Sequence, residues 1–462
     1  MSFDVSSDAV PSSAPSVSHS LKPRQLIMMG LGSAIGAGLF LGSGVGVKLA
    51  GPAVLVSYLV AGALVIIVMN ALGEMAAAKP SSGAFSVYAA DAFGPTAGAT
   101  LGWLWWVQMI VVVAAEAVGA AGLLASLWPQ LPVPLLAVLF MGSFTVVNLM
   151  GVRNFGEFEF WFAILKVVAI LAFIVTGIVL LAGGLPHAPS PGLSNFTGNG
   201  GFAPKGLAGI GAALLVVIFA FGGTEIVALA SAETADPARS LARTIRTVAW
   251  RVLIFYFGSL AVIIAVVPWT SEELSSPFAA VLKVAHIPGA ATAITLIAVV
   301  ALLSALNANL YGASRMLLSL AQRDEAPKRL AGMSRRKVPW LAVLASVLFG
   351  FVAAVLELVF PNKVLPALLN IVGATCLMVW TISLLSQLVL RARADRAGTP
   401  LPFRMAGYPW LTLLGLAVLA VIYVLIVLSA DTRMQLVSML ALTLVIAAVN
   451  AASRKLRGPV GA

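Results

Sequence analysis

The chain has 462 residues, of which 60% are hydrophobic and only 10% charged, and its formal net charge is +11. A mean hydropathy of +1.03 lies far outside the range of soluble globular proteins and excludes a water-soluble enzyme. The single cysteine, Cys376, excludes an internal disulfide.

Apolar segments long enough to cross a bilayer follow one another along nearly the whole chain. A spanning helix needs about 20 apolar residues. Twelve such segments are predicted, near 26–48, 52–76, 97–125, 133–150, 158–182, 207–231, 248–268, 289–318, 339–360, 365–390, 409–429 and 434–452. The sequence therefore predicts one all-α integral membrane domain at about 23–452. Residues 1–22, rich in Ser and Pro, are expected to be a disordered cytoplasmic tail, and 453–462 a second tail.

The apolar run from about Leu26 to Ala50, which includes the first predicted span, contains a glycine-rich stretch around Gly32, Gly36 and Gly38. Glycine holds a helix weakly, so the stretch favours a break at mid-membrane, where freed N–H groups at a positive half-helix end would bind a carboxylate. The alternative is close helix packing, because Gly32 and Gly36 have the spacing of two small residues on one helix face.

The predicted span near 207–231 contains a second weak point. Gly222 and Gly223 lie in mid-span, and Glu225 places a carboxylate beside them. The two weak points are five spans apart, and a repeat with an odd number of spans must be inverted in the membrane. The sequence thus predicts two inverted five-helix repeats, about 26–182 and 207–390, followed by two C-terminal helices at about 409–452.

Ionisable residues deep in a membrane are costly and are functional by default. Lys166, Glu116 and Glu225 lie inside predicted spans and are candidates for proton coupling. Their structural alternatives are snorkelling of the lysine and hydrogen bonds between helices. Glu74, Glu233 and Glu357 lie near span ends, where a structural role is expected. The three histidines fall in a tail or in loops, and the sequence predicts no metal site and no cofactor.

The placement of the basic residues argues against a nucleic-acid partner. Most of the 28 lysines and arginines lie in loops on the same side of the predicted membrane as the N-terminus. Exceptions are expected outside: Lys48, Lys205, Lys283, Lys363 and Arg433. This asymmetry predicts that both termini are cytoplasmic and that the chain lies in the cell inner (cytoplasmic) membrane, with its basic loops solvated beside anionic lipid.

Several motifs resemble one known family. They are Gly32-Ser-Ala-Ile-Gly-Ala-Gly-Leu-Phe40, Leu49-Ala-Gly-Pro52, Leu72-Gly-Glu-Met75, Phe155-Gly-Glu-Phe-Glu-Phe-Trp161, Phe219-Ala-Phe-Gly-Gly-Thr-Glu225, Ala232-Glu233, Ser314-Arg-Met316 and Ala326-Pro327. Together they resemble the amino-acid permeases of the amino acid–polyamine–organocation superfamily, in particular the bacterial proline, γ-aminobutyrate and aromatic amino-acid permeases. The resemblance runs from Leu21 through nearly the whole chain.

The resemblance implies a LeuT-like fold of twelve helices with alternating access. It implies that the substrate carboxylate binds at Ser33, Ala34, Ile35, Gly36, Ala37 and Gly38. The amino group is expected at the carbonyls of Phe219, Ala220, Phe221, Gly222 and Gly223, with Glu225 just beyond. Lys166 matches the span-five lysine that takes the place of sodium in proton-coupled relatives. The chain departs from close relatives at Ala37, where they often have Thr, and at Ala220, where many have Ser.

The sequence thus predicts a transporter and not an enzyme, because it contains no nucleophile–base set. The main hypothesis is import of an amino acid by proton symport, with a small neutral substrate such as proline or γ-aminobutyrate favoured. One alternative is amino-acid exchange. A more distant one is a membrane sensor or channel, although the chain has no predicted soluble output domain.

Overall fold

The computed structural model describes residues 35–81, 83–150, 155–223, 225, 237–428 and 430–457. Within these ranges all regular structure is helical and there is no strand. The α-helices are α2 (Ala37–Phe40), α3 (Gly42–Ala50), α4 (Val54–Ala78), α5 (Ala84–Phe93), α6 (Pro95–Leu127), α7 (Val133–Met150), α8 (Phe155–Leu181), α9 (Gly206–Phe221), α11 (Pro237–Val266), α12 (Pro277–Val284), α13 (Ala290–Gln322), α14 (Trp340–Val359), α15 (Val364–Arg396), α16 (Trp410–Leu428) and α17 (Ala430–Arg457). Short 3₁₀ helices are η1 (Gly51–Ala53), η2 (Ser194–Phe196), η3 (Glu272–Ser275) and η4 (Lys328–Ala331).

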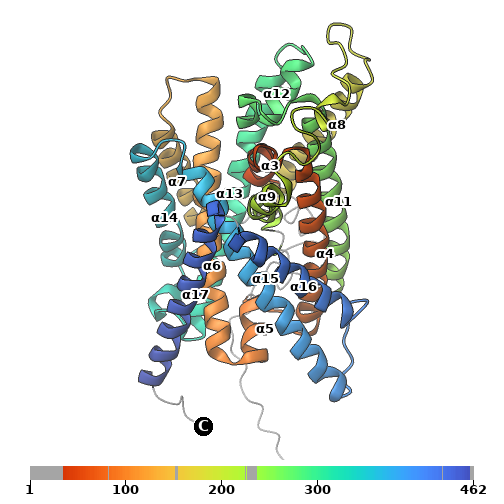
Figure 1. Ribbon diagram of the computed structural model, residues 1–462. Helices are drawn as coiled ribbons and strands as arrows, with labels where there is room; N and C mark the ends of the chain where they lie inside the picture. Colours follow the sequence, from red (N-terminus) through yellow and green to blue (C-terminus); the bar gives the residue numbers. More distant parts are fainter. Residues whose placement is uncertain are drawn as a thin grey trace, which may run out of the picture.

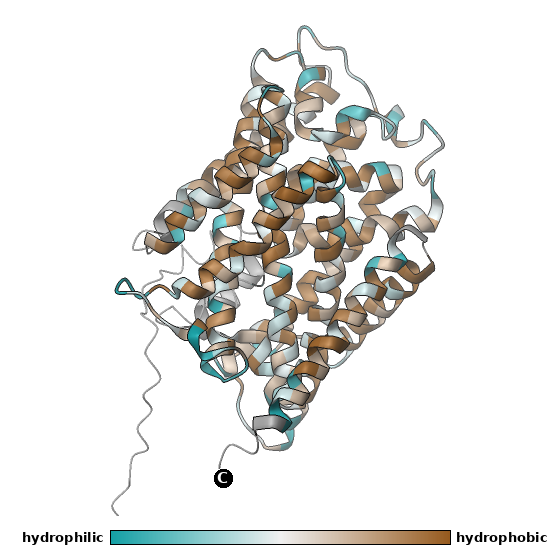
Figure 2. Ribbon diagram, turned by 90° about the vertical axis from the view of Figure 1, so that its left-hand side faces the viewer, coloured by the Kyte–Doolittle hydropathy of each residue, from teal (hydrophilic) through white to brown (hydrophobic). Residues whose placement is uncertain are grey.

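The described helices form a multi-pass membrane protein. Nine helical stretches among these residues are long and apolar enough to cross a bilayer. One of them, Ala37–Ala78, contains the later part of the first predicted span and the whole of the second, and η1 separates the two. Two shorter apolar helices, Gly206–Phe221 and Leu253–Val266, fall within two further predicted spans. Figure 2 shows apolar helices forming the body of the molecule and polar residues gathered in loops at its two ends.

The long helices α6 and α13 form the middle of the bundle and pack against each other (Figure 1). Helix α6 also contacts α5, α14 and α15, and most of its residues are buried. Helices α16 and α17 are largely exposed, with leucines and valines on their outer faces. Because lipid is as apolar as these side chains, such faces are the expected membrane-facing surface. The short α3 packs against α9 in the interior, which brings the two predicted weak points together.

Candidate functional site

The first predicted break lies partly within the described residues. Ile35 and Gly36 are not helical, and Gly36 has φ −142° and ψ −144°. Helix α2 then runs for only four residues, until Leu41, with φ −116°, separates it from α3. Ser33 and Ala34 lie outside the described residues. Helical structure is therefore interrupted at two points, Gly36 and Leu41. Ala37 and Gly38, which lie between these points, are helical.

Glu116 from α6 occupies the N-terminal end of α2. The backbone N–H of Ala37 donates to both carboxylate oxygens, at 2.9 Å to Oε2 and 3.1 Å to Oε1. The first N–H groups of a helix have no partner within the helix and carry partial positive charge, so they attract a carboxylate. A methyl group on Gly36 would overlap Glu116 Oε1 and come within 2.9 Å of Ala305 Cβ. Glycine at position 36 thus allows the carboxylate to approach.

The second predicted break lies at the end of α9. The helix ends at Phe221, Gly222 is extended (φ −62°, ψ 150°), and Gly223 has φ +93°, a conformation that favours glycine. The Gly223 N–H donates to Glu225 Oε2 at 2.8 Å. Trp380 Nε1 of α15 donates to Oε1 of the same carboxylate at 2.6 Å. Glu225 therefore fixes the interrupted end of α9 against α15.

The two interrupted segments touch each other. A methyl group on Gly38 would overlap the Cα of Ala220 and lie 2.9 Å from its Cβ. Two carbonyls that were expected to be free for a substrate amino group are occupied in this structure. Tyr256 Oη donates to the Ala220 carbonyl at 2.6 Å, and the Gly222 N–H donates to the Phe219 carbonyl at 2.9 Å. Each carbonyl oxygen can accept a second hydrogen bond, so the amino-group site expected at 219–223 stays a prediction.

Lys166 of α8 is fully buried and lies in a cluster of charged side chains. It interacts electrostatically with Glu159 and with Glu116. Ser304 Oγ of α13 donates to Glu159 Oε1 at 2.8 Å. Glu159 is not among the site residues predicted from the sequence. Its position seven residues before Lys166, two turns along the same helix face, is the signal that points to it.

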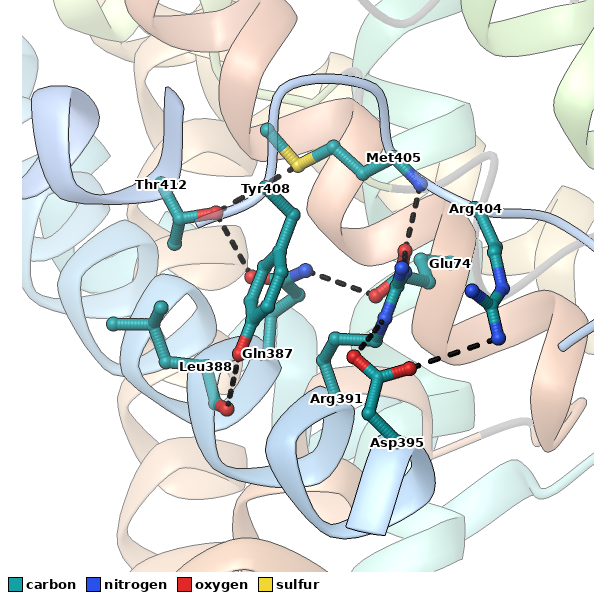
Figure 3. Close-up of polar contacts among 9 residues, drawn as sticks. All are labelled: Glu74, Gln387, Leu388, Arg391, Asp395, Arg404, Met405, Tyr408 and Thr412. Atoms are coloured by element: carbon teal, nitrogen blue, oxygen red, sulfur yellow. Dashed lines mark hydrogen bonds and ion pairs between the residues drawn. The ribbon is translucent and has the colours of Figure 1, made fainter. Parts of the chain in front are cut away.

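A second buried charge cluster lies where α4, α15 and the segment before α16 meet (Figure 3). Glu74 accepts hydrogen bonds from Arg391, from Gln387 Nε2 at 2.9 Å and from the Met405 N–H at 2.6 Å. The structural role expected for Glu74 matches these contacts. Arg391, expected in a solvated basic loop, is buried because Glu74 and Asp395 pair with it.

Of the two other glutamates for which a structural role was predicted, Glu357 has a structural contact. Glu357 accepts a hydrogen bond from the Asn362 N–H at 2.8 Å, close to the end of α14. Glu233 lies outside the described residues.

The chain matches the family model described as amino acid permease over residues 25–455. The chain belongs to the amino acid permease family. It is 47% identical to the aromatic amino acid transport protein AroP of Corynebacterium glutamicum, over 90% of this chain and 91% of that protein. It is 43% identical to the γ-aminobutyric acid permease of Bacillus subtilis (85% and 84%) and 39% identical to that of Escherichia coli (90% and 90%). These relatives are named as permeases or transport proteins and not as enzymes.

In this permease the residues predicted for coupling and for the substrate come together from distant parts of the sequence. Glu116 lies at the N-terminus of α2, Lys166 interacts with it, and Glu225 lies at the interrupted end of α9. Segment 35–38 meets segment 219–223 through Gly38 and Ala220. Within the described residues there is no group of three His, Cys, Asp or Glu side chains that could hold a metal ion.

Proposed function

We propose that this permease is a secondary active transporter that imports an amino acid by proton symport with alternating access. The observation that carries the proposal is the meeting of two interrupted helices, each with a buried carboxylate at its interruption. Interrupted helices with oppositely charged ends that face one another are the usual construction of a substrate site at mid-membrane. Membership of the amino acid permease family supports an amino acid as the substrate.

The substrate carboxylate would bind at the N-terminus of α2, in residues 33–38. The support is that the Glu116 carboxylate accepts a hydrogen bond from the Ala37 N–H in this segment. Binding of substrate then requires Glu116 to withdraw or to take up a proton, because two carboxylates repel each other. The substrate amino group would lie near residues 219–223 and Glu225, at the negative end of α9.

Proton coupling would use Lys166 and Glu116, with Glu225 as a further candidate. With Lys166 protonated and with Glu116 and Glu159 both ionised, the cluster carries one net negative charge inside a low-dielectric core. Binding of one proton neutralises it, and the titration belongs to the interacting groups jointly. A proton that binds better in one conformation shifts the equilibrium toward that conformation.

The proposed substrate is γ-aminobutyrate or an aromatic amino acid. The relatives named above carry those substrates in their names, at 39–47% identity. None of these three is named for proline, which the sequence analysis favoured equally with γ-aminobutyrate.

The finer architecture is also proposed. It comprises twelve helices, inverted repeats at about 26–182 and 207–390, two appended helices at about 409–452, and cytoplasmic tails at 1–22 and 453–462 in the inner membrane. The support is the spacing of the two interruptions and the excess of basic loops on one side. A fluorescent protein fused after Ala462 should then fluoresce in the cytoplasm, and a fusion that is dark there would overturn the orientation.

Uptake of radiolabelled amino acids into vesicles that contain the purified permease tests the function. We expect accumulation of γ-aminobutyrate or an aromatic amino acid that increases when the vesicle interior is made alkaline. Lys166→Met should retain substrate binding and lose this response to the pH gradient. The matched control is Lys363→Met, which changes an exposed lysine.

Three results would count against parts of the proposal. Uptake by Lys166→Met that still responds fully to the pH gradient would remove Lys166 from the coupling. Efflux that requires external amino acid would indicate exchange in place of symport. No uptake of any common amino acid by the wild-type protein would contradict the proposal as a whole.

A further inference from the structure

Gln108 of α6 is completely buried, yet its side-chain amide is unpaired within the part of the chain that the structure describes. Neither Oε1 nor Nε2 has a hydrogen-bond partner among the described residues, although the weakly bonding thiol of Cys376 lies beside the amide. A buried amide without a partner loses its hydrogen bonds to water and gains none in return. An apolar side chain of the same size would avoid that loss. A ligand that forms a hydrogen bond with the Gln108 amide would therefore supply the missing partner.

The position of Gln108 identifies which end of a ligand it would meet. A methyl group on Gly222 would lie 3.8 Å from Gln108 Nε2 and 3.9 Å from Cys376 Sγ. The amide therefore borders the interrupted carboxyl-terminal end of α9. The Cys376 thiol in turn contacts Glu225 Oε1 at 3.7 Å. The helix end and the Glu225 side chain both make this region favourable for a positive charge.

A second unpaired polar group borders the same helix end. The Tyr58 ring packs edge-on against Phe221, with ring centroids 5.9 Å apart, and its hydroxyl has no partner within the described chain. In contrast, the hydroxyl of the neighbouring Tyr256 is bonded to Ala220. The unpaired groups thus lie around the last turn of α9, where the proposed function places the amino group of the substrate.

We propose that Gln108 is a specificity-determining residue whose amide oxygen accepts a hydrogen bond from the amino group of the transported amino acid. Rotation of the terminal amide exchanges its oxygen and nitrogen, so the oxygen can face the end of α9. This inference rests on the proposed function and adds to it a residue outside both interrupted segments. It also states that the permease discriminates against carboxylates that lack an amino group.

The test compares one substitution at two buried glutamines. Gln108→Met removes an unpaired amide, whereas Gln387→Met removes an amide that donates to Glu74 and accepts from Thr412. For each purified variant, thermal unfolding is measured with and without γ-aminobutyrate and phenylalanine. Uptake is measured in vesicles, together with inhibition by butyrate and 3-phenylpropionate, the analogues without the amino group.

For Gln108→Met we expect unchanged or increased thermal stability without substrate and a roughly 10- to 100-fold higher KM, the effect of losing one hydrogen bond to a charged group. The preference for each amino acid over its deaminated analogue should fall by a similar factor, because the variant no longer forms a hydrogen bond with the amino group. Gln108→Asn, which keeps the amide on a shorter side chain, should lose less. Gln387→Met should lower thermal stability and keep the preference.

Two outcomes overturn the inference. One is destabilisation of Gln108→Met comparable with that of Gln387→Met, which would mean that the amide is bonded within the protein. The other is an unchanged KM and an unchanged preference over the deaminated analogues. Uptake by the wild-type permease measures the proposed function separately, so either outcome leaves that function standing.

Discussion

At the scale of single residues, two sets of buried charges in the described part of this permease have different surroundings. Glu116 binds the backbone at an interrupted helix and interacts with Lys166, so it lies where a ligand would compete for it. Glu74 is surrounded by protein donors from α15 and from the segment that contains Met405 (Figure 3). The first set contains Glu116 and Lys166, to which the proposed function assigns proton coupling. The second set joins three segments of the bundle.

The Glu74 cluster gives a prediction about stability. Removing one member of a buried ion pair leaves an uncompensated charge, which costs about 3–5 kcal/mol. We expect Arg391→Met to lower the free energy of unfolding by about that amount, as measured by denaturation of the purified permease in detergent.

The matched control is the exposed ion pair between Lys79 and Asp91, whose charged atoms are 2.7 Å apart. Asp91→Asn should cost less than about 1 kcal/mol, because solvent screens a surface pair. Equal destabilisation by the two substitutions would show that burial adds nothing to the Glu74–Arg391 pair. In the double variant Glu74→Met/Arg391→Met much of the stability should return.

Charged candidate site residues could be predicted from the sequence more readily than neutral ones. Lys166, Glu116 and Glu225 stand out because ionised groups are rare at membrane depth, and the structure places all three in buried contacts. Gln108 is a neutral residue in an apolar run, and no local pattern shows whether its amide is paired. Glu159 resembles a span-end residue in the sequence; its spacing from Lys166 places both on one helix face, and packing of α8 against α13 then buries it.

At the scale of elements, the contact between α2 and α9 depends on the absence of a side chain at position 38. A methyl group there would overlap the backbone of Ala220. We expect Gly38→Ala to separate the two interrupted segments and to reduce uptake at least tenfold, since displacements of about 1 Å in a site have effects of that size or larger.

Gly122→Ala is the matched control for Gly38→Ala. It lies in α6, and a methyl group at that position would have open space around it. Alanine there should leave uptake unchanged and slightly favour the helix. Normal uptake and normal KM in Gly38→Ala, measured beside this control, would contradict the close contact of α2 with α9.

The glycine clusters predicted the positions of the two helix interruptions but not the number of residues that each interruption covers. Helix α9 keeps its geometry through Phe219, Ala220 and Phe221 and ends only before the Gly222–Gly223 pair. The Tyr256 hydroxyl, from another helix, supplies a partner for the Ala220 carbonyl, one of the last carbonyls that α9 leaves without a partner of its own. A partner so far along the chain leaves no trace in the local sequence.

At the scale of the whole molecule, hydropathy alone predicts a multi-pass membrane protein, and the nine apolar stretches in the described residues agree with it. The criterion of a long unbroken helix works least well at α9, which has only 16 residues. That helix is short because it ends at the Gly222–Gly223 interruption. The Gly222–Gly223 interruption thus makes the spans hard to count and also forms part of the proposed site.

The central claim is that an amino acid binds between the N-terminus of α2 and the C-terminus of α9. The most direct measurement is an experimentally determined structure of the permease with γ-aminobutyrate or phenylalanine bound. The account predicts the carboxylate of the ligand at the N–H groups of residues 35–38 and its amino group beside Gln108 and Gly222. A ligand bound elsewhere, or two continuous helices through residues 35–50 and 206–225, would contradict it.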